Sequence, residues 1–119
     1  MSTNVAFAVF LFSFSLNAVA SDYCGNVLNQ EKLITCLGDE YSNVDKNLNI
    51  TYTKLRKSIS NSGSEKLKEA QKSWLIFRDK DCEFQASAAE GGQAYQPLYI
   101  SCQIEKTTTR TDELKNVSW

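Results

Sequence analysis

Histidine is absent from this 119-residue chain, and its 13 basic and 14 acidic side chains nearly cancel. Histidine is the side chain best suited to acid–base catalysis near neutral pH and is a frequent zinc ligand. The four cysteines show no C-x₂-C spacing, which also argues against zinc. A net charge of −1 supplies neither the basic patch of a nucleic-acid-binding protein nor a polybasic membrane motif. We therefore expect no cofactor, no metal and no nucleic-acid partner.

Charged side chains are also missing from residues 1–20, MSTNVAFAVFLFSFSLNAVA. The apolar run 5–16 is shorter than the roughly 20 residues of a membrane span, and residues 18–20 form an A-x-A cleavage site. We expect 1–20 to be a signal peptide and 21–119 to be one domain, periplasmic or secreted, without a stable membrane anchor. A non-cleaved anchor is the alternative, because the segment before the run lacks Lys and Arg.

Proline and glycine are scarce, and no alternating strand pattern is present. The first predicted helix begins near Asn29, a good N-cap residue, and carries apolar side chains at intervals of 4, 4, 3, 4, 4, 3 and 4 residues. Such intervals predict a nearly straight amphipathic helix. The positions are Leu33, Leu37, Tyr41, Val44, Leu48, Tyr52, Leu55 and Ile59.

A second helix is predicted from about Ser64 to Glu90, after a break at 61–64 in which Ser62 or Ser64 is the cap. One of its rows is largely apolar and is expected to be buried: Leu67, Ala70, Trp74, Phe77, Asp81, Phe84 and Ala88. A neighbouring row holds Gln71, Leu75, Arg78 and Cys82.

A third helix is predicted from Pro97, which suits a first turn, to Val117, although the threonines at 107–109 are poor helix formers. Four of its side chains are expected to face inward: Leu98, Cys102, Ile104 and Leu114. The three segments predict an all-α fold, an elongated antiparallel helical hairpin bundle.

The four cysteines all follow the predicted cleavage site, which indicates two disulfides in an exported protein. Four cysteines allow three pairings, and we predict Cys24–Cys36 with Cys82–Cys102. A hairpin that turns at Gly91-Gly92, where glycine suits a helix C-cap, brings Cys82 and Cys102 level with each other. The short segment before the first helix can fold back to bring Cys24 to Cys36.

A dense cluster of polar side chains lies within the second predicted helix. On a helix Trp74, Arg78 and Cys82 share one face, with Gln71 just before them. Asp79 and Asp81 are close in sequence, but residues two apart on a helix point to different sides. No nucleophile–base arrangement is present, so we interpret the cluster as structural and the protein as not an enzyme. A catalytic carboxylate pair is the alternative.

Several of these residues carry a resemblance. The chain resembles the LprI-type lysozyme inhibitor family, N-terminal domain, from Cys24 to about Leu114. The matching motifs are Leu48-Asn49-x-x-Tyr52, Leu67-x-x-Ala70-Gln71-x-x-Trp74-x-x-Phe77-Arg78-Asp79-x-x-Cys82, Gly91-Gly92, Cys102 and Arg110-Thr111-x-Glu113-Leu114. The resemblance implies an exported, all-helical bacterial domain with two disulfides that inhibits lysozyme.

An inhibitor of such a hydrolase needs a narrow projecting element that donates hydrogen bonds to the cleft carboxylates. We expect the partner, lysozyme or another peptidoglycan hydrolase, to contact Glu90, Gly91, Gly92, Gln93 and Tyr95. An ordinary helix–helix turn is the simpler interpretation of the same loop. The alternative function is an interaction or immunity protein for another toxin or envelope partner.

Overall fold

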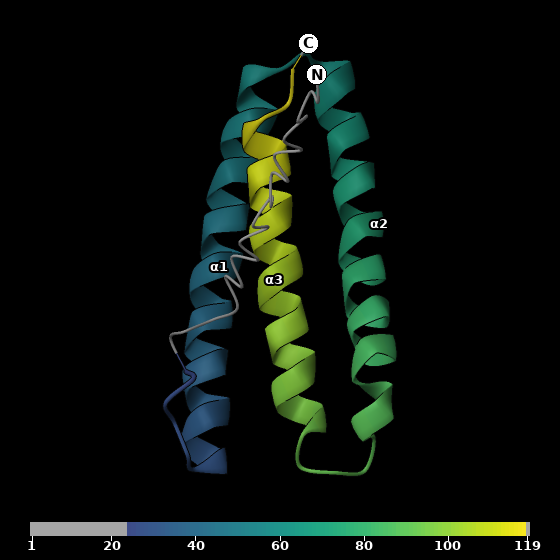
Figure 1. Cartoon of the computed structure of the whole chain (residues 1–119). Coiled ribbons are helices and arrows are strands. Elements are labelled where there is room, and N and C mark those ends of the chain that lie inside the picture. The colour runs from purple at the N-terminus through teal and green to yellow at the C-terminus, as the bar shows by residue number, and fades with distance from the viewer. Residues whose placement is uncertain (1–23, 119) are drawn as a thin grey trace, which may run out of the picture.

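The computed structural model describes residues 24–118, so the predicted signal peptide and its cleavage site lie outside the described part. Three helices make up the fold, each antiparallel to the one before it, and no strand occurs among the described residues (Figure 1). They are α1 (Gln30–Ser58), α2 (Asn61–Ala86) and α3 (Tyr95–Lys115), and the short 3₁₀ helix η1 (Ser87–Ala89) extends α2. The predicted all-α class is confirmed. None of the described helices is both long and apolar enough to cross a bilayer.

The helix starts follow local capping chemistry. The Asn29 side chain accepts a hydrogen bond from the backbone N–H of Lys32 at 3.0 Å, so the predicted start of α1 is confirmed. The break after α1 is shorter than expected. Ser60 caps α2 by accepting a bond from the N–H of Gly63 at 3.0 Å, so the prediction that Ser62 or Ser64 is the cap is wrong.

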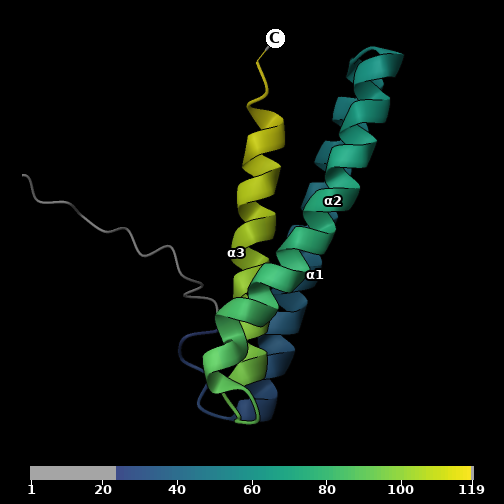
Figure 2. The ribbon, with the colours of Figure 1, turned by 90° about the vertical axis from the view of Figure 1, so that its right-hand side faces the viewer.

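α3 is the central helix, because it packs against both α1 and α2 along much of its length, whereas α1 and α2 have few contacts with each other. Figure 2 shows α3 separating from the other two helices toward its C-terminal end. The apolar core lies between α1 and α3. It is formed by Cys24, Leu37 and Ile104, with Leu33, Cys36, Tyr41, Val44 and Ile100 packed against it.

The inner side of α2 is the polar row rather than the aromatic row. Gln71, Arg78 and Cys82 are buried, whereas Phe77 is 58% exposed and Phe84 is 74% exposed. The expectation that Phe77 and Phe84 belong to a buried face is therefore wrong. Arg78 can be buried because it contacts groups on both α1 and α3, so the polar row of α2 faces inward and the aromatic row faces solvent.

α3 begins two residues earlier than predicted and ends at Lys115, with Pro97 in its first turn. Leu98 is 49% exposed and does not face inward, but Ile104 and Leu114 are buried as expected. The threonine run stays helical because Thr107 is fully buried.

Two threonine hydroxyl groups in this part of α3 bond back along the helix. Thr108 Oγ1 donates to Ile104 O at 2.8 Å, and Thr111 Oγ1 donates to Thr107 O at 3.0 Å. Their polar groups are thereby satisfied without a partner outside α3.

Both predicted disulfides are confirmed. Cys24 pairs with Cys36, with a Cα–Cα distance of 6.0 Å, and Cys82 pairs with Cys102 at 5.5 Å. The first bridge holds the segment before α1 against that helix. The second joins α2 to α3 about two and a half turns behind the loop that connects them.

Candidate functional site

The connection between α2 and α3 is a tight loop at one end of the molecule (the lower end in Figure 1). Gly91 has φ +81°, a left-handed conformation that a residue with a side chain adopts only with strain. A Cβ on Gly92 would lie 3.3 Å from the carbonyl oxygen of Ala89, which is a close approach. Gly91 is therefore needed for the turn itself, a side chain at position 92 would crowd it, and the predicted turn at Gly91-Gly92 is confirmed.

Part of the loop's hydrogen-bonding capacity is used internally. The N–H groups of Glu90, Gly92 and Tyr95 donate to Ser87 O, Ala89 O and Gly92 O at 3.1, 2.9 and 3.4 Å. Within the described loop, the backbone N–H groups of Gly91, Gln93 and Ala94 are the ones that remain free to donate to a binding partner.

A contact from α1 fixes the position of this loop. Gln30 Nε2 donates to the carbonyl oxygen of Gln93 at 2.6 Å, although the two residues are 63 positions apart. Behind the loop the rings of Tyr95 and Tyr99 stack with their centroids 6.2 Å apart. Tyr95 is half-buried by this packing, whereas Glu90, Gly91 and Gln93 are exposed. The loop is thus supported from three helices, and Tyr95 belongs to its support rather than to its tip.

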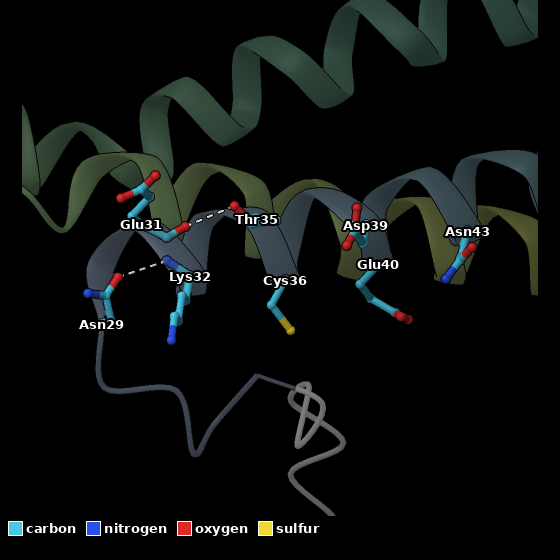
Figure 3. A pocket seen from close by; sticks show the side chains of 8 residues that line it. All are labelled: Asn29, Glu31, Lys32, Thr35, Cys36, Asp39, Glu40 and Asn43. Carbon is cyan, nitrogen blue, oxygen red and sulfur yellow. Dashed lines mark hydrogen bonds between the residues drawn. The ribbon is translucent and has the colours of Figure 1, made fainter.

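An open groove lies along the first turns of α1, next to the Cys24–Cys36 bridge (Figure 3). Its volume is about 580 Å³, and it is lined by Asn29, Glu31, Lys32, Thr35, Cys36, Asp39, Glu40 and Asn43. Three carboxylates against one lysine give this groove a net negative charge. Because Gln30 bonds to Gln93, the groove and the loop belong to the same end of the protein.

The polar cluster of the sequence forms a network in the middle of the bundle. Arg78 is 5% exposed, and its guanidinium donates to Asp79 Oδ1 at 2.9 Å and to Thr107 Oγ1 at 3.3 Å. The same group lies 5.4 Å from the ring centre of Trp74 and 5.5 Å from that of Tyr41. Arg78 therefore contacts groups on all three helices.

Neighbouring amides and a second arginine extend the network. Gln103 Nε2 donates to Asp79 Oδ1 at 3.0 Å and to the Tyr99 hydroxyl at 3.2 Å. Arg110 donates to Gln71 Oε1 at 3.0 Å, and its guanidinium lies 5.8 Å from the ring centre of Trp74. Every buried side-chain polar atom in the described part has a partner.

The electrostatics of this network favour a structural role. Burial raises the pKa of the Tyr41 hydroxyl and that of Tyr99 above their ordinary values, so both stay neutral at physiological pH. Hydrogen bonds from Lys106 and Gln85 lower the pKa of Asp81. Neither change gives a group that titrates near neutral pH, as a general acid or base requires. Among residues 24–118, no cluster of three or more potential ligands could hold a metal ion.

The comparison with known families matches residues 23–114 to the family described as "Lysozyme inhibitor LprI". The chain belongs to the LprI family.

Two relatives align over most of this LprI-family chain. It is 30% identical over 107 residues to the uncharacterized protein R02472 of Rhizobium meliloti, an alignment that covers 79% of this chain and 77% of the relative. It is 34% identical over 96 residues to the uncharacterized protein YecT of Escherichia coli, covering 68% of this chain and 59% of YecT. No solved structure matches.

The structure separates the predicted residues of this LprI-family chain into two sets. The proposed contact residues Glu90, Gly91, Gly92 and Gln93 lie together at the tip of the molecule. The structural residues lie away from it along the bundle, where Leu48 is 1% exposed. Tyr52 is half-buried. The guanidinium carbon of Arg56 lies over the Tyr52 ring, 5.7 Å from the ring centre.

Three residues of the site were not found from the sequence. Gln30 was not singled out in the sequence, but its side-chain amide donates to the carbonyl oxygen of Gln93 in the loop. Thr107 and Gln103 are buried polar side chains of α3 that contact Arg78 and Asp79. The burial of Thr107 had one possible signal, its spacing of three from Ile104 and seven from Leu114 on one helical face.

Proposed function

We propose that this chain inhibits lysozyme or a related peptidoglycan hydrolase by placing the loop 90–94 in the hydrolase cleft. The membership in the LprI family carries this proposal. The exposed, narrow loop at one end of a long helical stem supplies a suitable element for it. The two disulfides support an exported location, periplasmic or extracellular, because such bonds persist in oxidising compartments.

The loop has the chemistry that a glycosidase cleft recognises. Two carboxylates line such a cleft, and carboxylates accept strong hydrogen bonds from N–H groups. The loop can donate from the backbone N–H groups of Gly91 and Gln93 and from the Gln93 side-chain amide. Because Gly91 and Gly92 carry no side chains, the backbone can approach the base of the cleft closely.

The loop is also held in place before it binds. The Cys82–Cys102 bridge joins the two helices behind it, and the Gln30 bond fixes the carbonyl group of Gln93. A pre-ordered loop loses less conformational entropy on binding, which strengthens the complex.

Charge around the loop complements a basic partner. Glu90 lies in the loop, and Glu31, Asp39 and Glu40 line the neighbouring groove with only Lys32 to offset them. Opposite charges across an interface raise the association rate more than the intrinsic affinity. Inhibition of a basic hydrolase should therefore weaken as ionic strength rises.

A lysis assay with a panel of lysozyme classes tests the proposal. The oxidised protein should slow lysis by at least one class. Gln93→Ala should weaken inhibition, since it removes an exposed amide while leaving the backbone carbonyl that binds Gln30. Glu90→Arg should lower the association rate.

Glu105→Arg is the matched control for Glu90→Arg, because it makes the same charge change at an exposed position on α3. Equal effects of the two charge variants would contradict a role for the loop. Failure of the unmodified protein against every class would favour the other function, an interaction or immunity protein for a different toxin or envelope partner.

A further inference from the structure

The two ends of the molecule carry opposite charge, which the net charge of −1 for the whole chain does not reveal. No carboxylate occurs between Asp45 and Glu65. The segment 54–68, here called the basic turn, joins α1 to α2 and has five basic side chains against the one carboxylate of Glu65, a net charge of +4. The basic residues are Lys54, Arg56, Lys57, Lys66 and Lys68.

Most of the positive charge of the basic turn is not neutralised within the fold. Arg56 and Glu65 form an ion pair at 3.2 Å, so these two charges offset each other. The four lysines of the turn form no ion pair with any residue of the described part 24–118. Lys54, Lys57 and Lys66 are exposed and Lys68 is half-buried. Four ammonium groups are therefore available to an anionic partner.

These four lysines lie close to one end of the stem. α1 ends at Ser58 and α2 begins at Asn61, and Figure 1 shows this turn at the end opposite the loop 90–94. At 1.5 Å per residue, Lys54 and Lys68 lie about 6 and 10 Å from the turn along their helices. A surface that touches the turn therefore has all four lysines within about one Debye length, roughly 10 Å at 0.1 M salt.

The loop end is acidic. Glu31, Asp39 and Glu40 line the groove beside the loop with Lys32 as the one basic residue of its lining, and Glu90 lies in the loop itself. None of these four carboxylates forms an ion pair within residues 24–118. An anionic surface repels this end and attracts the other, which favours one orientation of the molecule.

We propose that the basic turn binds an anionic phospholipid surface, with the stem standing away from the surface and the loop 90–94 facing the solution. Clusters of four to eight Lys and Arg residues are typical of proteins that recognise anionic lipids. None of the large apolar side chains of the basic turn is exposed. The attraction is therefore electrostatic, and the adsorption is reversible and sensitive to salt.

A planar partner fits the basic turn better than a linear polyanion does. A shallow groove on α1 includes Lys54 and Lys57, but it also contains Asp45 and reaches neither Lys66 nor Lys68. A polymer lying in that groove would miss half of the lysine cluster, whereas a flat surface at the turn meets the lysines of both helices.

Co-sedimentation with lipid vesicles measures the binding. The oxidised protein should bind vesicles of phosphatidylcholine mixed with phosphatidylglycerol at low ionic strength, and the bound fraction should fall as salt is added. Vesicles of phosphatidylcholine alone are the neutral control and should bind none of it.

Charge reversal locates the contact. A lysine near an anionic surface contributes about fivefold to the partition coefficient, so Lys66→Glu should lower that coefficient by at least this factor. Adding Lys57→Glu should lower it by about fivefold or more again. Lys32→Glu is the matched control, because Lys32 is also exposed and also near the start of a helix, but lies at the acidic end. It should bind as the unmodified protein does, and circular dichroism checks that each variant keeps its helical content.

The orientation is measured on the unmodified protein by acetylation with a reagent that does not cross membranes, followed by mass spectrometry. Anionic vesicles should protect Lys54, Lys57 and Lys66 and leave Lys32 and Lys80 reactive.

Four results would overturn the proposal, and none of them depends on whether a hydrolase is inhibited. The first is no binding to anionic vesicles at low ionic strength. The second is an equal loss of binding in Lys32→Glu and Lys66→Glu. The third is uniform protection of all lysines on vesicles. The fourth is binding to a soluble polyanion such as heparin without binding to vesicles, which would assign the basic turn to a polymer.

Discussion

Replacing Arg78 by alanine tests whether the polar network holds the three helices together. The side chain is 6% exposed and is paired with Asp79, which is 43% exposed. Removal of one member of a fully buried pair costs about 3 to 5 kcal/mol. Because Asp79 can be hydrated and still accepts from Gln103, the cost should fall at the lower end of that range.

Two further losses act in the same direction. The contacts of Arg78 with Trp74 and Tyr41 are worth about 0.5 to 1 kcal/mol each at exposed sites and more when desolvated. The buried Thr107 hydroxyl also loses the hydrogen bond that the Arg78 guanidinium donates to it, and an unsatisfied buried acceptor adds to the cost. We therefore expect a total destabilisation of about 4 to 5 kcal/mol, the sum of about 3 kcal/mol for the ion pair and about 1 to 2 kcal/mol for the two ring contacts.

Urea unfolding of the oxidised protein measures this destabilisation. With a slope of about 1 to 2 kcal/mol per molar urea, the midpoint should fall by roughly 2 to 5 M. Arg56→Ala is the matched control, because that side chain is 29% exposed and bridges to the exposed Glu65; a surface pair contributes about 0 to 1 kcal/mol. Midpoint shifts of the same size in the two variants would refute the argument that Arg78 organises the interior.

Two other predictions concern α2 and its neighbours. Hydrogen bonds from Lys106 and Gln85 lower the pKa of Asp81 from 3.8, so this carboxylate stabilises the fold above about pH 4 and loses that effect as pH falls through its folded pKa. Asp81→Asn should therefore flatten the acid side of the curve of unfolding free energy against pH. An unchanged curve would contradict this pairing. Replacing Cys82 and Cys102 together by serine should lower the free energy of unfolding by about 3 kcal/mol. The variant should also inhibit the hydrolase less at a temperature where it is fully folded. Unchanged inhibition at that temperature would show that loop stiffness does not matter.

The features that the sequence predicted correctly depend on local chemistry or on chain geometry. Asn29 caps α1 through a bond three residues away, and Gly91 supplies a positive φ that other residues avoid. The pairing of Cys82 with Cys102 follows from a hairpin that turns midway between them. Each of these inferences needed no knowledge of which helix packs where.

The features that were predicted wrongly depend on tertiary contacts. Hydropathy ranked Phe77 above Arg78 as an inward-facing residue of α2, but Arg78 is the buried one. It can be buried because Thr107, Asp79 and two aromatic rings satisfy it, and those groups come from three different helices. For the same reason the bond from Gln30 to the loop could not be inferred from the sequence.

The antiparallel order of the helices separates the two ends of the molecule. The loop 90–94 lies at one end, and both the Ser60 turn and the last turn of α3 lie at the other. α1 has 29 residues, so the two ends are about 40 Å apart at 1.5 Å per residue. A tag, dye or surface tether attached after Lys115 would therefore leave the loop free, and binding partners can be captured on an immobilised protein without covering the surface that is proposed to bind them.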